Sequence, residues 1–336
     1  MIDFISDIIT LSRINKIQSK IKFCFFVENN FIYQYLEPYI KKKNNNNTII
    51  VSLETINIKD QEKKNYVLKT FFFRNIFFLT HKIKFLITST PDLDNSFFRK
   101  SKNNFTKYIY IQHSSLSLTK IYDEKAFLAF DAVQAVNIFQ YNELKKMNYL
   151  YNKKIKAFKS KYLYLKKKIS QGILNKEKKI LIAPTWQTNF YELNLHIKLK
   201  KIFDENKIEY ILRPHPMSLK KKEISVEKLK ANMINFDVNS ELNFKNYSHL
   251  ISDWSGIFVE YSIINKQYSI LINTKQKIRN IKSDKFPEIP LEIFSRDKLG
   301  YTLEIENLND IKNLLDKSNA DKENKITKFY DEYFFN

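Results

Sequence analysis

The chain has 336 residues, of which 43% are hydrophobic and 15% aromatic, so it can fill the cores of two domains and is not a disordered protein. Its three glycines lie far apart, which excludes the GxGxxG loop of classical Rossmann dehydrogenases and the GxxxxGKS/T loop of P-loop NTPases. The net charge of +21 favours anionic partners, and the single cysteine, Cys24, excludes disulfides and cysteine-based metal sites.

The sequence contains no run of 18 or more apolar residues, and its N-terminus lacks the pattern of a signal peptide. We therefore expect neither a transmembrane helix nor a leader, and a cytoplasmic location, which the unpaired cysteine also favours. A lysine-dense segment over 145–179 predicts electrostatic binding to an anionic membrane surface. The expected location is thus peripheral, at the inner face of the cell membrane.

The first part of the chain has the pattern of an α/β domain. Residues 2–17 form an amphipathic helix with acidic residues in its first turns. Short apolar runs separated by helical or polar stretches then predict strands at 21–27, 48–53, 85–89, 108–112 and 132–136. Strands of this kind form a parallel sheet covered on both faces. Residues 1–150 are therefore expected to form a Rossmann-like, acceptor-side domain.

A dense lysine and tyrosine segment follows, and we interpret 151–178 as a linker. The alternation then restarts, with strands expected at 179–183, 208–212, 233–236, 248–251 and 268–272 and helices at 193–206 and 256–264. This pattern predicts a second Rossmann-like domain over 179–305 that binds a nucleotide donor. Residues 306–336 are expected to form a C-terminal helix that closes on the first domain. Two open sheets of this type bind ligands at the carboxyl ends of their strands, facing a cleft.

An arginine and a histidine alternate with prolines directly after the expected strand 208–212. In Arg213-Pro214-His215-Pro216 the prolines fix φ on either side of the histidine, so a rigid loop presents one guanidinium beside one imidazole. Arg213 can hold a phosphate through two parallel donors, and His215 can donate to a developing phosphate charge or carry a proton. The alternative is a turn in which both side chains bind backbone carbonyls.

A strand ends and a helix begins across Ser252, Asp253, Ser255 and Gly256. The free N–H groups at such a helix start form an anion site, and Gly256 allows a close approach of the backbone. Asp253 would repel a diphosphate unless its charge is directed at backbone donors or a ligand hydroxyl. One turn further along, Glu260 is placed to reach a ribose hydroxyl. The alternative is an ordinary N-cap followed by a helix residue without a function.

Two more polar clusters follow expected strands. His113, after strand 108–112, would face His215 from the other domain, and base-assisted transfer from a nucleotide diphosphate needs a base on one side and donors for the leaving phosphate on the other. Thr185 and Trp186 lie between the domains, where a hydroxyl can bind phosphate and an indole can stack. A structural histidine and a packed interdomain aromatic are the alternatives.

Taken in order, His-Ser-Ser, Ala-Pro-Thr-Trp, Arg-Pro-His-Pro and Ser-Asp-Trp-Ser-Gly resemble the CDP-glycerol glycerophosphotransferase family of teichoic-acid-type polymerases, over roughly residues 108–275. The resemblance implies a GT-B enzyme that needs no metal. It implies that His113 deprotonates the acceptor hydroxyl and that His215, in the unchanged Arg-Pro-His-Pro motif, supports the diphosphate. The expected donor-binding residues are Thr185, Arg213, Ser252, Asp253, Ser255, Gly256 and Glu260.

The activity implied by this resemblance is transfer of glycerol phosphate from CDP-glycerol to a hydroxyl of a cell-surface glycopolymer or a polymer- or lipid-linked acceptor. The chain departs from the family pattern because His113 lacks a following glycine, Gly256 replaces a serine, and Glu260 stands where aspartate is usual. These departures leave open a GT-B glycosyltransferase that uses a CMP- or UDP-linked sugar for capsule or lipopolysaccharide synthesis.

The other function classes fit less well. A nucleic-acid-binding protein would explain the net charge, but only six of the 57 basic residues are arginine, the lysines spread along the whole chain, and no RNP pattern, GXXG loop or zinc module occurs. A noncatalytic membrane scaffold is a third reading. The remaining histidines, His81, His196 and His249, show no mutual ligand spacing, so we expect no metal site and no cofactor.

Overall fold

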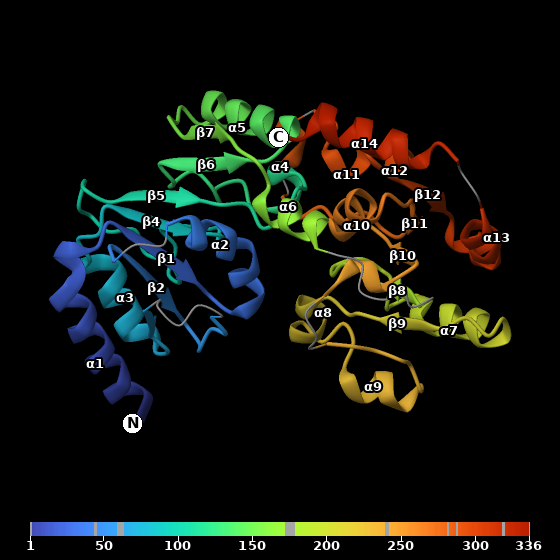
Figure 1. Ribbon diagram of the computed structural model, residues 1–336, viewed down its shortest axis with the longest axis horizontal. Helices are drawn as coiled ribbons and strands as arrows, with labels where there is room; N and C mark the ends of the chain where they lie inside the picture. The colour runs from blue at the N-terminus through green and yellow to red at the C-terminus, as the bar shows by residue number, and fades with distance from the viewer. Residues whose placement is uncertain are drawn as a thin grey trace.

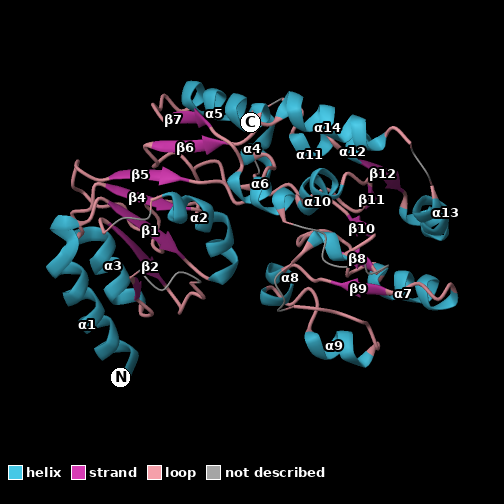
Figure 2. Ribbon diagram, in the orientation of Figure 1, coloured by secondary structure: helices cyan, strands magenta, loops and turns pink. Residues whose placement is uncertain are grey.

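The structure, a computed structural model, describes residues 2–43, 46–58, 64–171, 179–238, 242–280, 282–286, 288–317 and 320–335. Two α/β domains stand side by side, each built on its own parallel sheet (Figure 1). Helices cover the magenta strands of both sheets (Figure 2). The prediction of two parallel-sheet, Rossmann-like domains is confirmed. None of the helices in the described ranges is long and apolar enough to cross a membrane.

The first domain contains a seven-stranded sheet with the strand order β3-β2-β1-β4-β5-β6-β7. Its strands are β1 (Phe23–Val27), β2 (Thr48–Ser52), β3 (Asn65–Val67), β4 (Phe85–Thr88), β5 (Lys107–Tyr110), β6 (Ala132–Ala135) and β7 (Lys156–Lys159). Its helices are α1 (Ile2–Ile17), α2 (Asn30–Lys42), α3 (Phe71–Thr80), α4 (Leu118–Ile121) and α5 (Ile138–Leu150). The expected strands are therefore present, and two short edge strands join them.

Side chains that alternate along the central strand β1 enter two separate cores. Cys24 and Phe26 pack into the cluster that includes α1 and α3, whereas Phe25 and Val27 pack against α2. All four are fully buried, because helices cover both faces of the sheet. The continuous apolar run that predicted this strand is thus the signature of a two-sided parallel sheet.

The second domain contains a five-stranded sheet with the strand order β12-β11-β10-β8-β9. Its strands are β8 (Ile180–Ile182), β9 (Tyr210–Leu212), β10 (His249–Ser252), β11 (Ser269–Ile272) and β12 (Gly300–Leu303). Its helices are α7 (Leu195–Glu205), α8 (Pro216–Lys220), α9 (Val226–Ala231), α10 (Ile257–Asn265), α11 (Leu291–Phe294), α12 (Arg296–Leu299), α13 (Ile311–Asp316) and α14 (Lys322–Tyr333).

The strand expected at 233–236 is not formed in this domain. Only Phe236 pairs, as an isolated bridge to Leu212, while Met233 is 81% exposed and has a positive φ of 51°. A residue in the left-handed region cannot continue a strand, so the apolar run at this point makes a turn.

The segment interpreted as a linker contains regular structure. β7 pairs in parallel with β6 as the edge strand of the first sheet. Helix α6 (Leu163–Ser170) then packs between α2 of the first domain and α10 of the second. Its Tyr164 ring lies 4.4 Å from that of Tyr35 on α2. The rest of the expected linker, 172–178, lies outside the described residues.

The C-terminal helix α14 packs against α10 and α12 of the second domain. Its last residue, Tyr333, also reaches the first domain, where its ring lies 5.7 Å from that of Phe139 on α5. The residues after the helix continue this contact: the Phe335 N–H donates to the Val136 carbonyl at 3.0 Å and Phe334 pairs with Asn137. The end of α14 and the residues that follow it therefore join the two domains.

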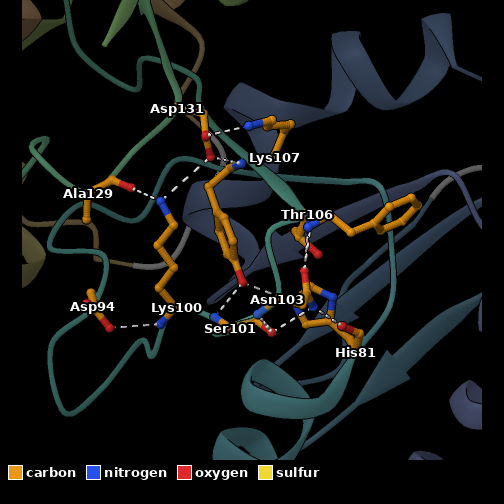
Figure 3. A network of polar contacts seen from close by, with 11 residues as sticks. His81, Asp94, Lys100, Ser101, Asn103, Thr106, Lys107, Ala129 and Asp131 are labelled. Carbon is orange, nitrogen blue, oxygen red and sulfur yellow. Dashed lines mark hydrogen bonds and ion pairs between the residues drawn. The ribbon is translucent and has the colours of Figure 1, made fainter. Parts of the chain in front are cut away.

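A polar network closes the amino end of the first sheet, away from the strand ends expected to bind ligands (Figure 3). The Tyr108 hydroxyl lies 3.3 Å from His81 Nε2 and accepts the Ser101 N–H at 2.8 Å, and the Asn103 amide donates to the His81 carbonyl. Burial lowers the pKa of His81 to about 4, so the ring is neutral. His81 therefore has a structural role, in which it connects β5 to the loop that precedes it.

Candidate active site

Loops at the carboxyl ends of β5, β8, β9 and β10 meet where the two domains touch. A Cβ added at Gly256 would lie 2.9 Å from Leu116 Cγ and 3.2 Å from Ser114 Oγ, so the start of α10 lies against the loop after β5. The proximity of His113 helps to lower the pKa of His215. We call the region formed by these four loops, and by the loop after β11 that lies over Trp186, the interdomain site.

His113 contacts a tyrosine hydroxyl at each ring nitrogen. Tyr110 lies 3.0 Å from Nδ1, and Tyr122 lies 3.2 Å from Nε2. Burial, aided by the charge of Lys277, lowers the pKa of His113 to about 4. The neutral ring has one N–H, for which the Ser89 carbonyl is a further acceptor, and one lone pair, which can accept a hydrogen bond from a tyrosine hydroxyl. An acceptor hydroxyl that reaches Nε2 has to replace the Tyr122 hydroxyl there.

His215 is held in one orientation by the helix that it precedes. Its Nδ1 accepts the Met217 N–H at 3.0 Å, which makes it the N-cap of α8, and Pro216 begins the helix. This bond assigns the proton of the neutral ring to Nε2, which becomes a donor. Burial, with the neighbouring charge of Lys277, lowers the pKa of His215 to about 3. The loop therefore presents an uncharged imidazole N–H.

Arg213 is fixed at the start of the same loop by an ion pair. Its Nη1 lies 3.2 Å from Asp237 Oδ2, and both side chains are about three-quarters buried. Its backbone N–H donates to the Ile182 carbonyl at 2.7 Å, which joins the end of β9 to β8. The guanidinium thus belongs to a pair whose charge is already balanced.

Asp253 is fully buried and directs its carboxylate at neighbouring protein donors. One oxygen accepts the Thr185 N–H at 2.8 Å and the other accepts the Thr188 hydroxyl at 2.9 Å. Burial nevertheless raises its pKa to about 6. Beside it, Ser252 Oγ donates to the Ala183 carbonyl at 2.6 Å. Ser252 and Asp253 therefore hold the loops after β8 and β10 together. The Asp253 carboxylate is directed at protein donors, which is the condition under which it would not repel a diphosphate.

Helix α10 starts at Ile257 without a side-chain cap. Gly256 occupies the N-cap position, and both Ser255 and Gly256 are half-buried. The first N–H groups of this nine-residue helix are consequently free of a capping side chain. Backbone donors and a positive helix end at this place are suited to a phosphate.

The structure does not bring Glu260 together with these loops. Its side chain is buried against α6, where Oε1 accepts the Tyr162 hydroxyl at 3.0 Å. Burial raises its pKa to about 7. The contact joins the second domain to the segment between the domains, so Glu260 has a structural role here.

Sequence reasoning missed four residues of the interdomain site. Tyr110 and Tyr122 bind His113, as described above, and two cations come from the loop after β11. Lys277 Nζ lies 4.4 Å from the centroid of the Trp186 ring, and Arg279 Cζ lies 5.0 Å from it. The sequence signal that could have identified these two cations is their position, because their loop directly follows an expected strand. In a chain rich in lysine, one more basic loop did not stand out.

Comparisons with known proteins agree with this arrangement. The family model described as CDP-Glycerol:Poly(glycerophosphate) glycerophosphotransferase matches residues 156–334. A search of curated proteins finds no significant match.

Solved structures share the fold over nearly the whole chain. A variant of the wall teichoic acid polymerase TagF has a TM-score of 0.58 at 14% identity, over 95% of this chain and 86% of that chain. A TagF variant soaked with CDPG has a TM-score of 0.58 at 14% identity, over 94% and 85%. UDP-N-acetylglucosamine 2-epimerase from Rickettsia bellii has a TM-score of 0.54 at 12% identity, over 92% and 94%. The GT-B architecture is confirmed.

Proposed function

The chain belongs to the CDP-glycerol:poly(glycerophosphate) glycerophosphotransferase family, and from this membership we propose how its interdomain site carries out the reaction. The protein is a transferase that moves glycerol phosphate from CDP-glycerol to a hydroxyl of a cell-surface glycopolymer or its precursor. The acceptor oxygen bonds to the phosphorus that carries glycerol, the bond from that phosphorus to the bridging oxygen breaks, and CMP leaves. The site must supply a base for the hydroxyl and donors for the leaving phosphate.

His113 is the proposed base. Its ring is neutral at the pH of a cell, because its pKa lies near 4, so one ring nitrogen has a lone pair available for a proton. The two tyrosine hydroxyls at its nitrogens fix the orientation of the ring. When the acceptor hydroxyl takes the place of Tyr122 at Nε2, Tyr110 keeps its contact with Nδ1 and orients the ring. The proton moves from the acceptor oxygen to Nε2 as the new bond to phosphorus forms.

His215 is the proposed donor to the leaving phosphate. The Met217 N–H occupies Nδ1, so the N–H at Nε2 is available to a ligand. It stabilises the negative charge that develops on the bridging oxygen as the bond breaks. A phosphate monoester has a second pKa near 6, so CMP leaves without needing a proton at neutral pH. The observation that carries the proposal is that two neutral imidazoles, one from each domain, lie on loops that meet at the interdomain site.

The donor nucleotide is proposed to bind to the second domain. Thr185, Ser255 and Gly256 lie on the loops that Ser252 and Asp253 hold together, and the uncapped amides of α10 supply phosphate donors. Arg213, paired with Asp237, is proposed to contact the donor from the β9 side. Glu260 has no place in this donor set, since its carboxylate is engaged with Tyr162.

We further propose that the protein works in the cytoplasm and binds peripherally to an anionic membrane that carries its acceptor. The net charge of +21 supports this proposal. So does an exposed aromatic contact outside the core, where the rings of Phe4 on α1 and Phe72 on α3 stack at 6.4 Å and both are about half exposed. Such side chains beside lysines are suited to a lipid interface.

A panel of donors tests the function. The protein is incubated with a lipid-anchored glycerol phosphate oligomer and CDP-glycerol, CDP-ribitol, or a CMP- or UDP-linked sugar, and products are measured by mass spectrometry. We expect CDP-glycerol to add glycerol phosphate units and release CMP. Turnover of a nucleotide-linked sugar with no turnover of CDP-glycerol would contradict the proposal.

A further inference from the structure

The loop after β11 places two cations in the interdomain site without a counter-ion. Lys277 and Arg279 both lie over the Trp186 ring, and Lys277 is half-buried. Within the described ranges, neither side chain forms an ion pair or a hydrogen bond. A cation–π contact holds a cation in place but does not balance its charge.

Nearby carboxylates do not neutralise this pair. Asp253, Glu223 and Glu292 are the acidic groups that act on Lys277, and each accepts a backbone N–H elsewhere. Burial and the like charge of Arg279 prevail over them and lower the pKa of Lys277 to about 7. Among the described residues, no carboxylate forms an ion pair with Lys277 or Arg279, and an anionic ligand would supply such a partner.

The loop is anchored so that the cations stay at the site. The Arg279 N–H donates to the Lys120 carbonyl at 2.9 Å, and the Asn280 amide donates to the Thr119 carbonyl at 2.8 Å. Both acceptors belong to α4 of the first domain, although the loop belongs to the second. The loop therefore spans the domain boundary, and the charge of Lys277 reaches both histidines of the site, whose pKa values it lowers.

Building on the proposed function, we infer that Lys277 binds the diphosphate of the donor between His113 and His215, and that Arg279 and Trp186 position it there. A diphosphate carries the negative charge that the two cations lack. Lys277 then stabilises the diphosphate before and during transfer, whereas His113 acts on the acceptor hydroxyl and His215 on the bridging oxygen.

Calorimetry of donor binding to the full chain tests this role. Lys277→Gln should weaken CDP-glycerol binding by about 10- to 100-fold, because it removes a charge-assisted phosphate contact. The substitution should weaken the binding of CMP less, because CMP has one phosphate. Lys275→Gln, which removes the same charge from an exposed side chain of the same loop, should bind CDP-glycerol like the wild type.

Thermal unfolding separates a binding role from a structural one. Because Lys277 is a half-buried cation without a counter-ion, Lys277→Gln should unfold at the wild-type temperature or higher. A fall in the unfolding temperature together with the affinity loss would assign Lys277 to structure and overturn the inference.

Proton uptake gives a further readout. At pH 8 much of Lys277 is neutral, and a bound diphosphate raises its pKa, so binding should take up protons, measured by calorimetry in buffers of different ionisation enthalpy. Glu292 and Glu260, with pKa values near 7, and Asp253, with a pKa near 6, are other groups that could take up a proton. Lys277→Arg keeps the charge but does not titrate, so it should bind donor and lose the uptake. Uptake that persists in Lys277→Arg would place the titration on one of these carboxyl groups and contradict the inference.

The two proposals fail in different ways. If wild-type protein binds CDP-glycerol and Lys277→Gln binds it within about twofold of Lys275→Gln, the role of Lys277 is wrong and the proposed function stands. If wild-type protein does not bind CDP-glycerol, the proposed function is wrong and the inference falls with it.

Discussion

His113 carries a tyrosine hydroxyl on each ring nitrogen, and its burial sets the pH at which it can act as a base. An imidazole with the ordinary pKa of about 6.5 would lose its base form below neutrality. The lowered pKa of His113, about 4, keeps the base form present down to mildly acidic pH. The chemistry of the site therefore depends on the surroundings of the ring as much as on the residue type.

The pH dependence of kcat/KM follows from this shift. Protonation removes the base, so the rate should fall as the pH drops through about 4 to 5 and should stay level between 5.5 and 6.5. The measurement is kcat/KM for CDP-glycerol across that range, with stability checked at each pH. Asp253, with a pKa of about 6, could add a limb of its own, and Asp253→Asn identifies that limb. An acidic limb centred at pH 6 to 7 that persists in Asp253→Asn would show that His113 is not buried as described or is not the base.

The chemistry-bearing residues that could be predicted were those with local sequence signals. His215 was recognisable because two prolines flank it, and Asp253 because it follows a strand and precedes a helix. The contacts of Lys277 depend on Trp186, 91 positions earlier, and those of His113 on two tyrosines without a motif. Such contacts arise from tertiary folding and leave no local pattern.

Among the elements, helix α10 makes two contacts that join distant parts of the chain. Its start lies against the first domain, and its next turn binds the residue that precedes α6. Gly256 lies against Leu116, and Glu260 binds the Tyr162 hydroxyl. Both contacts join segments that are far apart in the chain. The helix therefore joins the second domain both to the loop of His113 and to the segment between the domains.

Gly256→Ala tests the contact at the helix start. The added Cβ would lie 2.9 Å from Leu116 Cγ, so the loop after His113 must shift, which should cost about 1 to 3 kcal/mol and lower kcat. In a Leu116→Ala background the clash is absent, and Gly256→Ala should cost less. The free energy of unfolding of all four proteins measures this coupling. Additive effects would show that the two domains do not touch here.

Glu260→Gln separates a structural role from a role in ribose binding. The pKa of Glu260 is raised from 4.5 to about 7. Its protonated carboxyl therefore stabilises the folded protein at low pH, and this contribution is lost as the pH rises through 7. Glutamine carries no charge, so the variant should gain up to about 2 kcal/mol over the wild type between pH 6 and 9. CDP-glycerol affinity should stay within twofold. A large loss of donor affinity with unchanged stability would restore the ribose role.

The elements that could be predicted were those with strong apolar runs. β1, β2, β4 and the strands of the second sheet's centre were recognisable because their residues are buried on both faces. The edge strands β3 and β7 contain no fully buried residue and were missed. β12 begins at Gly300, where an added Cβ would lie 2.6 Å from the Ser269 carbonyl, a requirement that only the folded neighbour shows.

At the scale of the whole molecule, charge and the α1 surface bear on where the protein works. The lysines spread over the chain favour an anionic surface, while α1 exposes apolar side chains such as Ile2 and Ile5. Lysines near an anionic leaflet contribute about 1 kcal/mol each and are screened by salt.

Vesicle flotation distinguishes these two sources of membrane binding. The protein should float with vesicles rich in anionic lipid and should be released at about 1 M salt, where the Debye length falls to about 3 Å. Neutral vesicles serve as the control. Retention at high salt would show that apolar insertion of α1, rather than charge, holds the protein.

The central claim is that the two domains divide the transfer between a base, His113, and a donor to the leaving phosphate, His215. Its most direct test is CMP release by His113→Ala, with CDP-glycerol affinity measured on the same protein and His249→Ala, on the far end of β10, as control. We predict a fall in turnover of about 10²- to 10⁴-fold with donor affinity nearly unchanged. Near-normal turnover in His113→Ala would contradict the account.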